Sequence, residues 1–210
     1  TRLAKSTDWD ECGNIPLHLV CRNPSASLQI VKFLVESWPG SIRESTWDGC
    51  FPLHCLCQNS RLDDAAALDI LKYLVREDPT KVREAHSQGN LPIHFAAGEG
   101  RKGPEFCDYL VNEFPESITV GCVNNMLPLQ TACSSGRLDT VKYLFELYPE
   151  SVQLHSHRGY YPIHETVFNR KDRLEIFDFL QTIDPGCLSK KVNIRDGSRF
   201  NGNLPLHAIL

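Results

Sequence analysis

The stretch Gly89-Asn90-Leu91-Pro92-Ile93-His94 recurs with small changes along the whole 210-residue chain. The other copies are centred on five further prolines: Pro16, Pro52, Pro128, Pro162 and Pro205. Successive prolines in this series are separated by 36, 40, 36, 34 and 43 residues. A period in this range is typical of stacked structural repeats, in which each unit contacts only its neighbours. We therefore interpret the chain as a repeat array rather than as one globular core.

A second apolar segment follows each of the first five copies of the motif. In the first unit, residues 28–38 are apolar at a spacing that gives a broad face on a helix, and Pro39 ends the segment. Equivalent segments end at Pro79, Pro115, Pro149 and Pro185. The motif proline itself suits the first turn of a helix, where its missing N–H has no cost. Each unit is therefore predicted to contain a turn, a helix A that begins at the motif proline, a short loop, a helix B and an extended connector.

Glycine marks two further places in the unit. A glycine three residues before the motif proline predicts a tight turn at positive φ, and Asn125 takes this place in the fourth unit because asparagine also tolerates that conformation. Gly100 and Gly136 are expected at the C-terminal end of helix A. Two segments of variable length, Arg61–Leu68 and Lys190–Phe200, are expected to be solvent-facing loops.

These patterns divide the chain into successive units. The predicted boundaries are 1–12 for the tail of a preceding repeat, 13–45, 46–85, 86–121, 122–155 and 156–198 for repeats 1 to 5, and 199–210 for a partial sixth repeat. No polar capping repeat is visible at either end, although repeat arrays need such caps for solubility. We therefore expect either a fragment of a longer array or ends that a partner covers.

Charge and cysteine usage restrict the class of protein. The net charge is −4 and the pI is about 6.0, whereas a nucleic-acid binder usually has a basic face, so no nucleic-acid partner is expected. No run of 18 apolar residues is present, and membrane insertion is not expected. Three of the nine cysteines, Cys21, Cys57 and Cys133, lie five residues after a motif proline, where a small buried residue is needed. From this spacing we expect the cysteines to be free thiols and the protein to lie in an intracellular, reducing compartment, most simply the cytoplasm.

The motif and the helix B pattern together resemble the ankyrin repeat. The closest local matches are Pro92-Ile93-His94-Phe95-Ala96-Ala97-Gly98-Glu99-Gly100 and the segment 128–144. The resemblance implies an all-α, ankyrin-repeat solenoid of stacked helix-turn-helix units with extended turn connectors. The chain departs from the family where helix B ends, because it has proline there in place of a left-handed glycine. We expect an additional helical turn at this corner, through Ser41-Ile42, Ser117-Ile118 and Ser151-Val152.

Five histidines share one place in the motif: His18, His54, His94, His164 and His207. The resemblance implies a structural hydrogen bond between repeats, and Gln130 in the same place of the fourth unit favours this role over catalysis or metal binding. A zinc site formed by Cys50, His54, Cys55 and Cys57 is the alternative, but these residues occupy structural places in the repeat. No phosphate loop or nucleophile motif is present, so no cofactor, metal or enzymatic activity is expected.

Protein recognition is the function that remains. In ankyrin arrays the turn tips and the exposed side of helix A line a concave groove that binds partner proteins. Trp47, Phe95 and Phe168 are the predicted anchors, because aromatic residues with few neighbouring charges are typical of interfaces, unless they pack on the next repeat. The other predicted partner-binding residues are Leu19, Arg22, Gln58, Glu99, Thr131, Glu165, His157 and Arg158. The alternative is a structural or targeting segment of a larger chain or assembly whose enzymatic domain lies outside residues 1–210.

Overall fold

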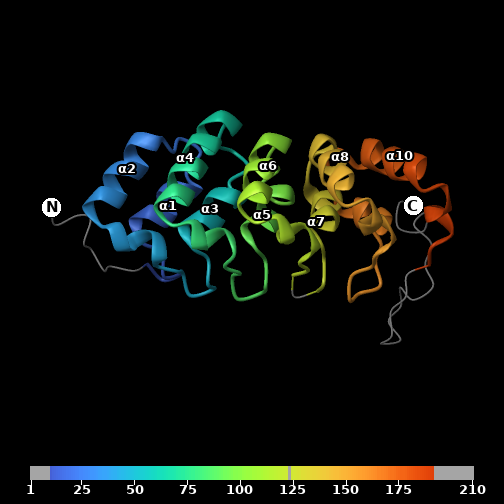
Figure 1. Cartoon of the computed structure of the whole chain (residues 1–210), viewed down its shortest axis with the longest axis horizontal. Helices are drawn as coiled ribbons and strands as arrows, with labels where there is room; N and C mark the ends of the chain where they lie inside the picture. Colours follow the sequence, from blue (N-terminus) through green and yellow to red (C-terminus); the bar gives the residue numbers. More distant parts are fainter. Residues whose placement is uncertain (1–9, 123, 192–210) are drawn as a thin grey trace.

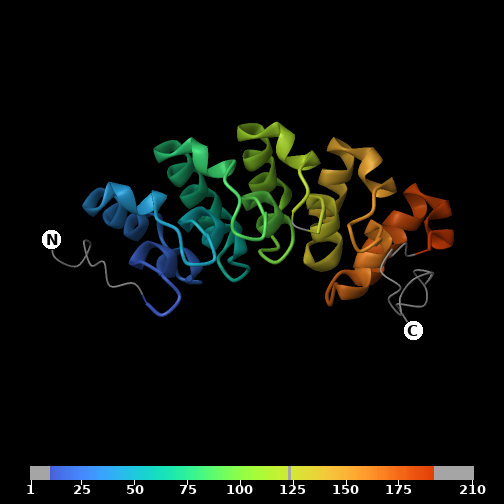
Figure 2. The ribbon, with the colours of Figure 1, turned by 90° about the horizontal axis from the view of Figure 1, so that it is seen from below.

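The computed structural model describes residues 10–122 and 124–191, and within them it forms a row of paired helices. Figure 1 shows the row from the side, with the extended turns projecting in one direction. Figure 2 shows that the row is bowed, with helix A of each repeat on the inner side and helix B on the outer side. The described residues contain no β-strand. The predicted all-α stack of helix-turn-helix units is confirmed.

The inner layer consists of five short helices, each of which begins at a motif proline as predicted. These helices are α1 (Pro16–Arg22), α3 (Pro52–Gln58), α5 (Pro92–Ala97), α7 (Pro128–Ser135) and α9 (Pro162–Glu165). Each contacts the next one along the row. The inner layer is therefore a continuous strip of side-by-side helices.

The outer layer consists of the longer helices that the apolar pattern predicted. They are α2 (Leu28–Ser37), α4 (Asp64–Glu77), α6 (Pro104–Glu113), α8 (Leu138–Leu147) and α10 (Arg173–Ile183). Each ends one residue before an aromatic or acidic residue that is followed by proline, as at Trp38-Pro39. The apolar faces of both layers pack into one hydrophobic core that runs the length of the array. Such a core grows with each added repeat.

The corner after helix B contains the additional turn that the prolines predicted. A 3₁₀ helix begins at each of these prolines, over Pro39–Arg43, Pro79–Val82, Pro115–Thr119, Pro149–Gln153 and Pro185–Ser189. Proline fixes φ near the value of a first helical turn, so it starts a new helix where a left-handed glycine would reverse the chain. The expectation of an extra helical turn is confirmed.

The turns before helix A have the predicted backbone conformation. Gly13, Gly49, Gly89 and Gly159 have φ between +72° and +79°, and Asn125 has φ +54°. The expectation that Gly136 ends helix A is confirmed, because it caps the C-terminal end of α7, whereas Gly100 lies beyond the end of its helix. Helix α5 ends at Ala97, and neither glycine has a positive φ.

The two glycines are instead required by the close approach of neighbouring repeats. A Cβ atom on Gly100 would overlap the carbonyl oxygen of Cys57, and one on Gly136 would overlap that of Ala97. Both overlaps are with the backbone of the preceding helix A, which cannot move aside without shifting the repeat. The missing side chain therefore sets the spacing between consecutive repeats.

The segment Arg61–Leu68 is not the solvent-facing loop that was expected. Most of it forms the start of α4, which has 14 residues where α2, α6 and α8 have 10. Asp63 caps this helix, since its carboxylate accepts the N–H groups of Ala65 and Ala66 at 3.1 Å. Leu62 and Ala67 are buried, so the inserted residues also belong to the core. The Lys190–Phe200 segment lies mostly outside the described residues.

No helix within the described ranges is both long and apolar enough to cross a membrane. All nine cysteines lie in the described part of the chain, and all are free thiols. Cys21, Cys57 and Cys133 are fully buried, as their place in the repeat predicted. Burial raises the pKa of all three thiols above the ordinary value, so they behave as small apolar side chains.

Candidate partner-binding face

The motif histidines hold the inner side of the array in place. His54 accepts a hydrogen bond at Nδ1 from the backbone N–H three residues before it, and its Nε2 lies 3.1 Å from the Glu84 carbonyl oxygen. His94 repeats this arrangement, with its Nε2 3.0 Å from the Val120 carbonyl oxygen. Each ring therefore joins the start of its own helix A to the connector that leads into the next repeat.

Gln130 shows which property of the histidine the fold uses. Its Oε1 accepts the Leu127 N–H at 2.8 Å, and its Nε2 donates to the carbonyl oxygens of Tyr160 at 3.0 Å and Leu154 at 3.4 Å. The amide thus supplies the same acceptor and the same donor as a neutral imidazole. The predicted hydrogen-bonding role is confirmed at His54 and His94. His207 lies outside the described residues.

Burial keeps these rings uncharged. Burial lowers the pKa of His18, His54 and His94 to about 4 from the ordinary value of 6.5. The positive charge of Arg22 adds to this effect at His18, and the neighbouring His86 ring adds to it at His54. Because Nδ1 of each ring already accepts a backbone N–H, protonation there would also break the bond at the start of helix A.

The turn tips form the lower edge of the inner face. In each tip the backbone closes on itself, and backbone hydrogen bonds join the tips of repeats 1 and 2, 2 and 3, and 4 and 5. Trp47 N–H donates to Cys12 O at 3.3 Å, Ser87 N–H to Asp48 O at 3.0 Å, and His157 N–H to Asn124 O at 2.7 Å. The tips joined in this way are fixed relative to one another, and their side chains present a preformed surface.

Sequence reasoning did not find the residue that closes each tip. Asp10, Thr46, His86 and Ser156 lie at equivalent places and accept the backbone N–H four residues later through a side-chain atom. His86 does so at 3.1 Å and is buried, so it is not an exposed tip residue. The signal in the sequence was that each of these four polar residues lies six places before a motif proline.

Trp47 is the most exposed large apolar side chain of the inner face. It lies at the tip of repeat 2 and is 72% exposed. Its ring occupies the space beside Gly13, where a Cβ atom would meet the indole at 2.6 Å. The glycine turn of repeat 1 thus supports the edge of the ring and leaves most of the indole open to solvent.

Phe168 supplies a second exposed aromatic side chain at the opposite end of the array. It ends the 3₁₀ helix Thr166–Phe168 that follows α9, and it is 58% exposed. Its ring centroid lies 6.3 Å from that of Tyr160, which stacks in turn on His164. Tyr160 was not among the predicted site residues, although its place in the motif is taken by asparagine, cysteine or methionine in other repeats.

Between these two ends the inner face has a hollow of about 190 Å³ beside α5 and α7. Three of the predicted partner-binding residues, Phe95, Glu99 and Thr131, line it. Gly98 also lines it, and a Cβ atom there would lie 3.2 Å from Thr131 Cβ, so the glycine allows the two helices to approach closely. Glu99 also accepts a hydrogen bond from Gln58 Nε2 at 2.7 Å, which joins repeats 2 and 3 across the face.

Two of the predicted partner-binding residues are not on the surface. Phe95 is only 8% exposed, because its ring packs edge-on against His86 at 5.0 Å and against His54 at 5.9 Å. Glu165 is only 4% exposed. Both lie three residues after a motif proline, a place that faces the preceding helix A. Leu19 has the same place but is 50% exposed, since the described residues contain no helix A before α1.

The remaining predicted residues lie at or near the surface. Arg22, His157 and Arg158 are exposed, and Gln58 and Thr131 are half-buried. Arg22 Nη1 donates to Asn14 Oδ1 at 2.9 Å, which places its guanidinium at the tip of repeat 1. The structure therefore brings most of the predicted side chains to one bowed face. Whether a partner binds there stays a prediction.

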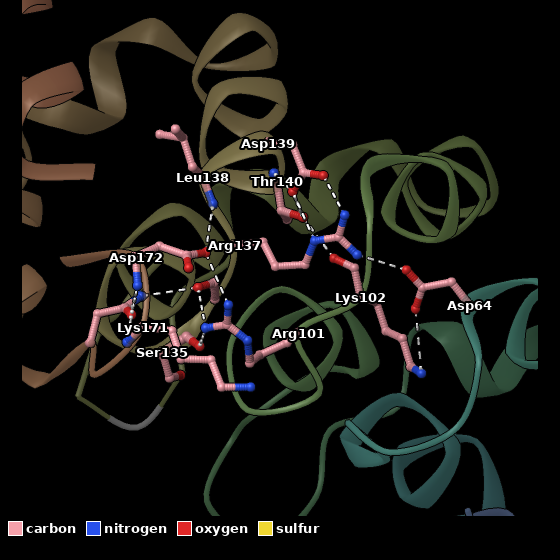
Figure 3. Close-up of polar contacts among 12 residues, drawn as sticks. Asp64, Arg101, Lys102, Ser135, Arg137, Leu138, Asp139, Thr140, Lys171 and Asp172 are labelled. Atoms are coloured by element: carbon pink, nitrogen blue, oxygen red, sulfur yellow. Dashed lines mark hydrogen bonds and ion pairs between the residues drawn. The ribbon is translucent and has the colours of Figure 1, made fainter. Parts of the chain in front are cut away.

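Buried amides, together with a basic side chain, lock the ends of helix A to the neighbouring repeat. Asn59 Nδ2 donates to the carbonyl oxygens of Cys21 and Asn23, and Asn169 Nδ2 donates to that of Gly136. In repeat 3, Arg101 donates to the carbonyl oxygens of Ser135 at 2.8 Å and of Gly136 at 2.7 Å (Figure 3). Asn59 and Asn169 share one place, seven residues after the motif proline, whereas repeat 3 uses Arg101 instead. Sequence reasoning therefore did not connect them as one kind of contact.

Comparison with known proteins agrees with this geometry. A family model described as ankyrin repeats, in three copies, matches residues 64–155. Residues 64–155 are ankyrin repeats. The matched segment runs from α4 to just beyond the 3₁₀ helix after α8, and the same arrangement of paired helices continues on both sides of it. A search of curated proteins found no match to the chain. Ankyrin repeats are generally protein-interaction modules and are typically non-catalytic.

Proposed function

We propose that this ankyrin array binds a partner protein on its inner face and performs no catalysis of its own. The observation that carries the proposal is the exposure of Trp47 and Phe168 on a backbone that is fixed by hydrogen bonds between repeats. Exposed aromatic side chains on a preorganised surface lose little conformational freedom on binding, and such residues dominate the energetics of protein interfaces.

The polar groups between the two aromatic side chains give the face its selectivity. Glu99 and Thr131 line the hollow beside α5 and α7, and Gln58 donates to Glu99. Arg22 and Arg158 add positive charge near the ends. A partner segment that crosses the face would bury apolar contacts at both ends and satisfy these polar groups between them. Complementary charge at such positions selects among partners more than it adds affinity.

The free cysteines support a proposal about the compartment. Eight of the nine thiols are buried or half-buried without a disulfide, and the fold needs none of them oxidised. We infer a reducing compartment, most simply the cytoplasm.

Site-specific photo-crosslinking tests the binding face. A benzophenone amino acid would replace Trp47 or Phe168 in one pair of proteins, and Phe33 or Leu174 in a matched control pair. The control side chains lie on the outer-layer helices α2 and α10 and are 64% and 63% exposed, so their general reactivity is matched. We expect a shared crosslinked protein from the inner positions. Equal crosslinking from the outer positions would contradict the proposal.

A further inference from the structure

The outer layer contains a groove that the proposed function does not use. Two adjoining hollows of about 650 Å³ and about 430 Å³ lie between α4 and α6. Both are lined by Leu68, Pro104 and Glu105, so they form one continuous surface, which we call the helix B groove. Each hollow exceeds the 190 Å³ of the hollow on the inner face.

The insertion in repeat 2 builds one wall of the helix B groove. The additional turn of α4 supplies Asp64 and Ala65, and Leu68 follows directly after it, whereas α6 begins only at Pro104. The longer helix therefore projects beyond the start of its neighbour and leaves a recess in front of α6. Without the four additional residues, α4 would have the length of α6 and this wall would be absent.

An ion pair closes one end of the groove (Figure 3). Arg137 Nη1 at the start of α8 lies 2.8 Å from Asp64 Oδ2, and thus spans repeat 3 entirely. The pair passes over Gly103, where a Cβ atom would lie 3.2 Å from the carboxylate and 3.5 Å from the guanidinium. The glycine leaves room for the pair, and the pair fixes the wall of α4 relative to α8.

The basic groups at this end are already engaged. Arg137 also binds Asp139, with Nη2 and Oδ2 2.6 Å apart. Lys102 is only 1% exposed, and its Nζ donates to the Leu62 carbonyl oxygen at 3.0 Å and lies 3.7 Å from Asp64 Oδ1. Neither cation is therefore available to a ligand in the groove.

The carboxylates along the groove make fewer ion pairs than the cations do. Within residues 10–122 and 124–191, neither Asp69 nor Glu105 has a basic group within ion-pair distance. Asp108 accepts hydrogen bonds from Tyr143 Oη and Asn112 Nδ2, both at 2.9 Å. Lys72 is the one basic side chain that lines the second hollow. The rim is thus predominantly acidic over a floor of Leu68 and Pro104.

We propose that the helix B groove binds a short basic segment of a partner protein, in which arginine or lysine side chains flank an apolar residue. The apolar residue would cover Leu68 and Pro104, and the flanking cations would pair with Asp69 and Glu105. Arginine suits this arrangement because its stem packs on apolar surface and its guanidinium stacks on rings such as Tyr109 at the rim. The groove is separate from the inner face, so one array can hold two different segments.

The test uses a defined peptide and the full 210-residue chain. The probe is an acetylated Arg-Arg-Leu-Arg peptide, its position on the protein is followed by amide chemical shifts in NMR, and its affinity by fluorescence anisotropy. We expect shifts at the start of α4 and α6. We also expect affinity to fall about tenfold or more in the double variant Asp69→Lys/Glu105→Lys.

The matched control is the double variant Glu146→Lys/Asp178→Lys, which reverses two exposed carboxylates on α8 and α10 outside the groove. Equal loss of affinity in both double variants would show unspecific attraction to an acidic protein and would overturn the proposal. Peptide-induced chemical-shift changes confined to the inner face would also overturn the proposal.

If the lysine variant is not folded by circular dichroism, Asp69→Asn/Glu105→Gln replaces it. A peptide with serine for leucine should bind more weakly, and unchanged affinity would contradict the apolar floor.

Discussion

Arg101 of repeat 3 and Asp172 of repeat 5 form an ion pair, Nη2 to Oδ2 at 2.9 Å, that skips the repeat between them (Figure 3). The same guanidinium donates to the Ser135 and Gly136 carbonyl oxygens of that intervening repeat. In a simple repeat stack, stability comes from contacts between nearest neighbours. The Arg101 side chain thus couples three repeats at once. The Arg137–Asp64 pair also skips a repeat, because it joins repeats 2 and 4 directly.

Arg101→Ala should therefore destabilise the C-terminal half of the array. The change removes the guanidinium donor from two backbone carbonyls and from the Asp172 carboxylate. The Gly136 carbonyl keeps its bond from Asn169 and the Asp172 carboxylate keeps its bond from the Leu138 N–H, and we expect a loss of about 1–3 kcal/mol in the free energy of unfolding. Arg101→Lys should recover only part of this, because an ammonium cannot reach three acceptors in the same fork. Urea denaturation measures both changes. The control Arg76→Ala removes an exposed pair with Glu77 and a contact with the Tyr73 ring within the same helix, and should have little effect.

Gly100→Ala and Gly136→Ala should be among the most damaging single substitutions in the chain. The added methyl group would overlap a backbone carbonyl oxygen of the preceding repeat, and we expect a loss of about 3 kcal/mol or more. Gly186→Ala is the matched control, since the nearest atom to its Cβ would be Asp184 Oδ1 at 3.4 Å. Thermal denaturation of the three variants compares them. Equal stability of the Gly100→Ala and Gly186→Ala variants would show that the repeats are not held at this distance.

Histidine and glutamine should be interchangeable at the shared place of the motif. Gln130→His and His94→Gln keep one acceptor for the start of helix A and one donor for the next connector, so the free energy of unfolding should change by less than about 1 kcal/mol. His94→Ala removes both bonds and opens a cavity, and should lose about 2–4 kcal/mol. Denaturant titration of the three variants distinguishes these values. A large loss for His94→Gln would point to a role that an amide cannot supply.

Acid should destabilise the array through its buried histidines. The folded chain lowers the pKa of His18, His54 and His94 to about 4, whereas the unfolded chain binds these protons near pH 6.5. The unfolded state therefore holds more protons between these values, and stability falls as pH decreases from about 6.5 to about 4. Each histidine contributes at most about 1.4 kcal/mol per pH unit in this window. The His94→Gln variant should show a shallower dependence, and an identical profile would exclude His94 as a source.

Glu165 should act in the opposite direction. Burial raises the pKa of its carboxyl to about 7 from 4.5, and the positive charge of Arg158 opposes this only in part. The unfolded chain releases this proton first, so the contribution of Glu165 to stability is lost as pH rises from about 4.5 to about 7. Glu165→Gln should therefore stabilise the protein at pH 8 by about 2–3 kcal/mol and change little at pH 4.5. Stability curves at the two pH values test this, and equal effects at both would contradict a buried, protonated carboxyl.

The fold was largely predictable because the same sequence pattern recurs along the chain. Six copies of a proline motif in register with an apolar helix pattern fix where helix A and helix B begin, and the proline after helix B predicted the 3₁₀ turn. Arg61–Leu68 was misread because the length of an insertion does not tell an inserted loop from a lengthened helix. A capping residue distinguishes the two. Asp63, with its carboxylate one residue before α4, was the available signal.

The binding face was less predictable than the fold. Membership of helix A gives the side of the array on which a residue lies, but exposure depends on the size of its neighbours in the adjacent repeat. Phe95 is covered by two histidine rings, whereas Trp47 rests on a glycine and stays open. The contacts that skip a repeat were not predictable at all, because Arg101 and Asp172 lie 71 residues apart in the chain and no spacing rule connects them.

The most direct test of the proposed function is quantitative capture of binding proteins by two matched triple variants of the chain. The inner variant carries Leu19→Ser, Trp47→Ala and Phe168→Ala, and the outer variant carries Ile30→Ser, Phe33→Ala and Leu174→Ala. Both remove three exposed apolar side chains of comparable exposure, and circular dichroism checks that each is folded. We predict that a protein captured by the unmodified chain is retained by the outer variant and lost by the inner one. Equal retention by both, or loss only with the outer variant, would contradict recognition on the inner face.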